Sequence, residues 1–152
     1  MVYVECKPDR ELVRTIKPGE IVIPAGGKSG VCKRLENAYH AKGLVDEDPQ
    51  SARPPYMDKL KSLDGRESVK LYYDSFRKNF LIVLCPRLEE WILNAVKELN
   101  IDLKDYNLPA DPNKLHAVIN SNLKNFRELL HTLKQKQSKK LAVLEEFLKK
   151  ED

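Results

Sequence analysis

The sequence predicts an α/β fold: a mostly parallel sheet covered by helices, with a C-terminal helical extension. Over the first hundred residues, short apolar runs alternate with segments of helical periodicity, which is typical of βαβ units. Glycine and proline pairs such as Pro18-Gly19 and Gly26-Gly27 separate these segments. After Asp111-Pro112, a typical helix start, apolar residues recur every three or four positions to the end.

Five strands are expected, each a short apolar run bounded by turn or charged residues. They cover residues 2–5, 21–23, 42–46, 69–73 and 79–85. The last two are separated only by the polar residues 74–78, which is short enough for a hairpin. The other connections leave room for a helix between strands, so we expect those strands to run parallel.

Helices are expected where apolar residues share one face. The ranges are 8–16, 29–39 and 88–99, followed by 114–120, 123–136 and 139–149. Residues 49–68 contain Pro54-Pro55 and Asp64-Gly65, so a mobile connection with one short helix around 57–63 is expected. The chain thus divides into an α/β domain, 1–110, and a helical extension, 111–152, packed on it.

Composition and charge exclude several classes of protein. The longest apolar stretch, 80–85, is far shorter than the ~18 residues of a membrane-spanning helix. The first residues do not resemble a signal peptide, so the cytoplasm is the expected compartment. The three cysteines, Cys6, Cys32 and Cys85, are an odd number at unrelated spacings, which argues against a disulfide framework and a zinc site.

Acidic side chains follow two of the expected parallel strands. Glu5 ends the first strand, Asp46 ends the third, and Asp48 lies two residues further on. Side chains at the carboxyl edge of a parallel sheet converge where ligands bind. Such carboxylates suit Mg²⁺, which prefers oxygen ligands and keeps water and substrate phosphates in its remaining positions. The alternative is that Asp46 to Pro49 is simply a polar turn.

These residues carry a resemblance to a known family. Val4-Glu5, then Gly26-Gly27, then Leu44-Val45-Asp46-Glu47-Asp48 resembles the Toprim domain of topoisomerases, primases and OLD-family nucleases. The segment 86–93, Pro-Arg-Leu-Glu-Glu-Trp-Ile-Leu, is similar to one found in small stand-alone prokaryotic Toprim proteins, with Glu89 as the matching acid. Cys6 stands where Toprim proteins usually have glycine.

The resemblance implies Mg²⁺-dependent phosphoryl transfer on nucleic acid, with Mn²⁺ as a possible substitute. Glu5, Asp46 and Asp48 would hold the metal, and Glu89 would complete the catalytic acids. The alternative, which Cys6 favours, is a non-catalytic module that binds nucleic acid or a protein. No nucleotide-hydrolysing motif is present, so any partner ATPase would be a separate chain.

Two groups of residues are candidates for contacts with phosphates. Gly26, Gly27 and Lys28 precede an expected helix N-terminus, which itself attracts phosphate, and Lys7 and Arg10 follow Glu5. The net charge of +4 arises in residues 112–152, because residues 1–111 contain equal numbers of basic and acidic side chains. This excess predicts a nucleic-acid backbone surface or, alternatively, an ordinary solvated helix face. Its candidates are Lys134, Lys136, Lys139 and Lys140.

Overall fold

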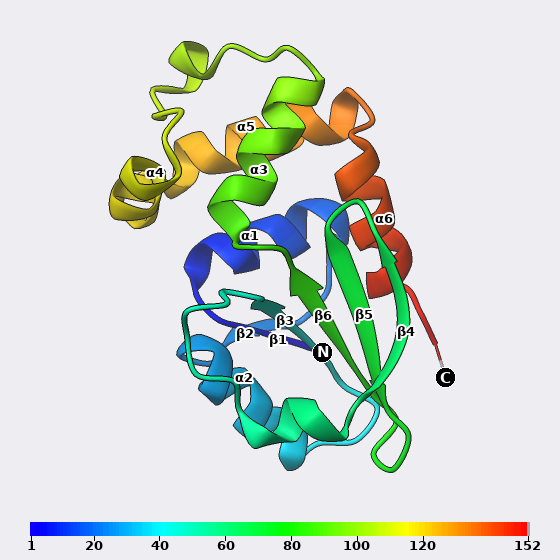
Figure 1. The fold of residues 1–152 in the computed structure, drawn as a ribbon. Helices are drawn as coiled ribbons and strands as arrows, with labels where there is room; N and C mark the ends of the chain where they lie inside the picture. Colours follow the sequence, from blue (N-terminus) through cyan, green and yellow to red (C-terminus); the bar gives the residue numbers. More distant parts are fainter. Residues whose placement is uncertain (152) are drawn as a thin grey trace.

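A six-stranded mixed sheet forms the centre of the computed structural model, which describes residues 1–151 (Figure 1). The strand order is β2-β1-β3-β6-β5-β4. Neighbours from β2 to β6 run parallel, and β5 and β4 join antiparallel. The predicted α/β class and the hairpin of the last two expected strands are therefore confirmed. The bounds are β1 Val2–Val4, β2 Val22–Pro24, β3 Lys42–Asp46, β4 Lys61–Arg66, β5 Val69–Asp74 and β6 Asn79–Leu84.

Helices cover both faces of the sheet (Figure 1). On one face lie α2 (Gly27–Glu36) and the short 3-10 helix η1 (Pro55–Lys59). On the other lie α1 (Lys7–Ile16), α3 (Leu88–Glu98), α4 (Pro112–Val118), α5 (Leu123–Gln135) and α6 (Lys139–Leu148). Two more 3-10 turns, η2 (Leu103–Tyr106) and η3 (Ile119–Ser121), connect the helices of this second layer.

The central strand β6 shows why the sheet needs two covering layers. Successive side chains of a strand point to opposite faces. Phe80, Ile82 and Leu84 accordingly belong to the core under α1, α3, α5 and α6, whereas Leu81 and Val83 belong to the core under α2. Every residue of β6 is buried, so its apolar run corresponds to burial on both sides.

The expectation for residues 49–68 is correct only in part. The short helix is present as η1, which ends at Lys59, but residues 61–66 form the edge strand β4, which pairs with β5. Sequence reasoning missed β4 because its side chains are mostly exposed and show no apolar alternation. Its turn to β5 is made by Glu67 and Ser68, both with positive φ (53° and 57°), rather than by the Asn-Gly pair that signals such turns.

The predicted helices of the C-terminal region are confirmed, and they share the core of the sheet. Helix α5 packs against α1, and α6 packs against β5. Phe126, Leu130 and Phe147 are fully buried in the same cluster as the strands. The apolar stripes of these helices are therefore used inside the fold. Among residues 1–151, no helix has the length and apolar character required to cross a membrane.

Candidate functional site

The carboxyl ends of β1, β3 and β6 meet at one edge of the sheet because these strands are parallel neighbours. Helix α1 begins close after β1, and α3 begins close after β6, so both helix N-termini lie at this edge. The positive end of a helix dipole stabilises negative charge. The edge therefore combines two strand ends that bear acids with two helix ends that favour them.

Glu5 and Asp46 are brought into direct contact here. The backbone N–H of Asp46 donates to Glu5 Oε2 at 2.5 Å. Asp46 Oδ1 in turn accepts a hydrogen bond from the N–H of Leu88, the first residue of α3, at 3.0 Å. In each of these two carboxylates, one oxygen thus accepts a hydrogen bond from a backbone N–H. The other oxygen of each carboxylate receives no hydrogen bond from residues 1–151.

Asp9 is a further acid of this edge that sequence reasoning missed as a site residue. It is the third residue of α1 and is only 4% exposed. Its Oδ2 accepts from the backbone N–H and from the thiol of Cys6, each at 3.1 Å. Acids in the first turn are common because they stabilise helices. The signal that could have singled out Asp9 is that its helix starts directly at a ligand-binding edge.

Glu89 reaches the same cluster from the first turn of α3. It is 4% exposed, and its Oε1 lies 3.6 Å from Nδ1 of His116. The neighbouring Glu90 instead forms an ion pair with Arg87. Of these two adjacent acids, Glu89 is thus the buried one.

The electrostatics of the cluster are those of acids crowded away from water. Burial, followed by the charges of Asp9, Glu5 and Glu89, raises the pKa of Asp46 to about 9. Burial and the charge of Glu5 raise the pKa of Asp9 to about 7. Burial also raises the pKa of Glu5, against the opposing effects of the Asp46 N–H and Lys28. At neutral pH the cluster must therefore keep protons or gain a compensating cation.

Asp48 lies beside this cluster rather than inside it. Its backbone N–H donates to the carbonyl of Pro86 at 2.8 Å, and its φ is +37°. Its side chain lines two cavities, of about 340 Å³ toward Lys28 and about 400 Å³ toward Arg87. In the part of the chain that the structure describes, no three His, Cys, Asp or Glu side chains are arranged to hold a metal ion.

The glycine turn supports the backbone of the first acid. The N–H groups of Gly26 and Gly27 both donate to the carbonyl of Glu5, at 3.2 and 3.1 Å. Both glycines have φ above +80°, a conformation that side chains disfavour. The following Lys28 bridges the loop after β3, donating from Nζ to the Glu47 carbonyl at 2.6 Å and to Ser51 Oγ at 2.8 Å. Of the three candidates for phosphate contacts in this turn, Gly26, Gly27 and Lys28, only Lys28 lines the cavity of about 340 Å³.

The residues after Glu5 have different environments. Lys7 is exposed in the first turn of α1. Arg10 is half-buried, and its Nε is buried without a hydrogen-bond partner among the described residues. Partial burial and the charge of Asp9 raise the pKa of the Cys6 thiol. A reactive thiolate is therefore disfavoured at Cys6, which serves instead as the N-cap residue of α1.

The four lysines proposed as a nucleic-acid surface do not form one patch. Lys140 is 5% exposed and forms ion pairs with Glu67 and Glu98. Lys134 donates from Nζ to the Thr15 carbonyl at 2.8 Å. Two of the four thus fasten the C-terminal helices to the rest of the fold. Only Lys136 and Lys139 are exposed with no ion pair or hydrogen bond from their side chains to residues 1–151.

Comparisons with models of protein families, with curated proteins and with solved structures found no match.

Proposed function

We propose that this protein carries out Mg²⁺-dependent phosphoryl transfer on nucleic acid, cleaving phosphodiester bonds at the carboxyl edge of its sheet. The observation that carries this proposal is the gathering of Glu5, Asp9, Asp46 and Glu89 at that edge, where burial and repulsion between charges raise the pKa values of Glu5, Asp9 and Asp46. The resemblance of Glu5, Asp46 and Asp48 to the Toprim signature supports the same reading.

A hard divalent cation suits these residues. Glu5 and Asp46 each have one oxygen held by a backbone N–H and one without a hydrogen bond from residues 1–151. Mg²⁺ usually takes one or two protein carboxylates and completes its shell with waters and substrate phosphates. A preformed group of three acids is thus not required, and Asp48, which lines the adjacent cavity, is the candidate for a further ligand. Mn²⁺ accepts the same oxygen ligands.

Different residues of this edge would have different roles in the proposed reaction. When bound, the cation supplies charge stabilisation at the phosphate and lowers the pKa of bound water. Glu5, with its raised pKa, can accept or return a proton at the attacking group. Lys28, beside the cavity that Asp48 lines, would hold a phosphate oxygen. Glu89 and Asp9 would add negative charge around Asp46 and so strengthen the attraction of the cluster for a cation.

A second candidate function is binding without catalysis. The absence of three ligand side chains arranged for a metal within residues 1–151 favours it. So does Cys6, which stands where Toprim proteins usually have glycine. In this reading Asp46 keeps its proton and the module holds nucleic acid or a protein.

A cleavage assay separates the two functions. Wild-type protein is incubated with supercoiled plasmid, single-stranded DNA and RNA in Mg²⁺, Mn²⁺ or EDTA. We expect metal-dependent cleavage that is lost in D46N and E5Q and strongly reduced in E89Q. E90Q is the matched control, because Glu90 pairs with Arg87 instead of joining the cluster. Absence of cleavage, together with equal thermal stability in EDTA and in metal, would overturn the proposal. Binding without cleavage would support the second candidate.

A further inference from the structure

A separate cavity lies at the opposite end of β3 from the carboxylates, at the amino edge of the sheet. It has a volume of about 380 Å³. Lys42 and Phe80, which pair in neighbouring strands, form its centre. The other lining residues come from the loop before β3, from the β5–β6 turn and from the C-terminal segment. They are His40, Ala41, Lys78, Lys150 and Glu151.

The cavity carries an excess of positive charge. Among the residues that the structure describes, three lysines and one carboxylate, that of Glu151, line the cavity, and Lys42, Lys78 and Lys150 form no ion pair. Lys42 is half-buried, with Nζ 5.8 Å from the centroid of the Phe80 ring. Burial, followed by the charge of Lys17, lowers the pKa of Lys42, and the charges of Glu20 and Glu151 oppose this effect only in part. A bound anion would stabilise the ammonium form of Lys42.

Aromatic rings are exposed in the loops next to the cavity. Tyr39 is 63% exposed and Phe76 is 76% exposed. The two loops are tied together, since the His40 N–H donates to the Arg77 carbonyl at 3.0 Å and Arg77 Nε donates to the Glu36 carbonyl at 2.9 Å. The Arg77 guanidinium also lies 5.4 Å from the centroid of the Phe76 ring. The rings are thus presented on anchored loops.

This edge also bears four of the five large hydrophobic side chains that are exposed among the described residues. Five large hydrophobic side chains are exposed among the described residues: Met1, Ile21, Tyr39, Leu63 and Phe76. All except Leu63 lie just before β1, β2 or β3, or in the turn before β6.

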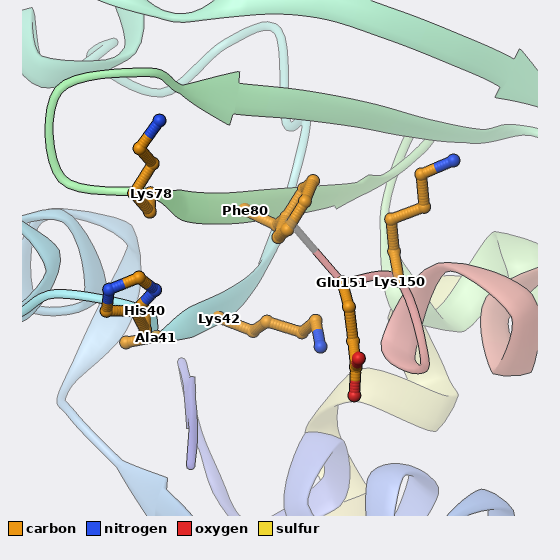
Figure 2. A pocket seen from close by; sticks show the side chains of 7 residues that line it. All are labelled: His40, Ala41, Lys42, Lys78, Phe80, Lys150 and Glu151. Atoms are coloured by element: carbon orange, nitrogen blue, oxygen red, sulfur yellow. The ribbon is translucent and has the colours of Figure 1, made fainter.

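The arrangement of charges and rings indicates the kind of partner. Figure 2 shows Lys78 and Lys150 on opposite sides of Phe80, with Lys42 extending from the side of His40 toward Glu151. Charges spread in this way suit successive phosphates of a chain better than one compact anion. Exposed rings next to a basic groove can stack on unpaired bases, which a duplex keeps covered.

We propose that the amino edge of the sheet is a binding site for single-stranded nucleic acid. Lys42, Lys78 and Lys150 contact the phosphates, and Phe76 and Tyr39 stack on bases. The site is distinct from the carboxylate cluster and needs neither a metal nor catalysis. Its failure and the failure of the phosphoryl-transfer proposal are therefore distinguishable.

The test is fluorescence anisotropy with labelled oligo(dT) of about 20 nucleotides. EDTA is present, so that no metal-dependent cleavage occurs, and KCl is varied between about 50 and 200 mM. We expect the K42Q/K78Q/K150Q variant to bind about tenfold or more weakly, with its salt slope reduced by about 2. We expect F76A to lose between about fivefold and a hundredfold in affinity without a change of slope. The K97Q/K104Q/K114Q variant removes the same charge at exposed positions elsewhere and should leave both quantities unchanged.

Several results would overturn the proposal. Equal losses in the two triple variants would show that only net charge matters. An unchanged slope in K42Q/K78Q/K150Q, or a slope reduced only by K136Q/K139Q, would place the contact elsewhere. Equal affinity for duplex DNA of the same length would exclude base stacking. If the triple variant does not fold, the single variants K78Q and F76A at exposed positions carry the test.

Discussion

Replacing Asp46 with asparagine should stabilise the metal-free protein at neutral pH. The folded protein holds this carboxyl in its protonated form, with a pKa of about 9, mainly through burial and then through the charges of Asp9, Glu5 and Glu89. Asparagine has nearly the same shape and is neutral at every pH. Its Oδ1 can still accept the N–H of Leu88, which Asp46 accepts at 3.0 Å.

The direction and size of the effect follow from proton linkage. In the unfolded chain Asp46 ionises near its ordinary pKa of 3.8, whereas the folded chain retains the proton up to a pKa of about 9. Stability therefore falls as pH rises between these values. At about 1.36 kcal/mol per pH unit, the interval from 3.8 to pH 7 corresponds to about 4 kcal/mol. Part of the pKa shift of Asp46 reflects repulsion from Asp9 and Glu5, and these acids can themselves take up a proton and so relieve it. We therefore expect D46N to raise the free energy of unfolding by about half of this value, ~2 kcal/mol.

Urea denaturation in EDTA at pH 5 and pH 8 measures this effect. We expect D46N to be more stable than wild type by ~2 kcal/mol or more at pH 8, and by ~1 kcal/mol or less at pH 5. The D48N variant is the control, since Asp48 lies outside the buried cluster and lines the neighbouring cavities. The reasoning is refuted if D46N is less stable than wild type at pH 8, or if its advantage is the same at both pH values.

Two further predictions concern residues that hold the fold around the site. Gly30→Ala should destabilise the protein by ~2 kcal/mol or more, because the added Cβ would lie 1.9 Å from the carbonyl oxygen of Ala25. Thermal unfolding measures this loss, and Gly65→Ala is the control because its added Cβ would have its nearest contact at 3.9 Å. Lys140→Met should cost ~1–2 kcal/mol in urea unfolding, because it leaves two partly exposed glutamates unpaired. Lys136→Met should change stability by less than ~0.5 kcal/mol, and equal effects at the two lysines would contradict the structure.

The sequence was informative where burial leaves a periodic trace. The strands β1, β3 and β6 are apolar runs because they are buried, and the acids that follow β1 and β3 stand out as the first polar residues after them. The contact of Glu5 with the Asp46 N–H follows from this placement. The strand β4 left no such trace, because an exposed edge strand needs no apolar face.

The role of an individual charged residue was harder to predict, because it depends on distant parts of the chain. Lys140 looks like its neighbour Lys139 in the sequence, yet it is buried because Glu67 and Glu98 come from a turn and a helix far earlier in the chain. Asp9 has the sequence signature of an ordinary first-turn acid. Only the meeting of α1, α3 and β3 makes it part of a carboxylate cluster.

The two edge strands, β2 and β4, influence whether this protein associates with other copies of itself. An open sheet edge can recruit a strand from another molecule, which leads to aggregation. At one border, β2 is only three residues long and ends at Pro24, which has no N–H to donate. At the other, the pairing of β4 shifts between Ser62 and Asp64, and Lys61 and Arg66 add charge. Both borders are thus poor templates, and the sheet can remain open-ended without growing by addition of further strands.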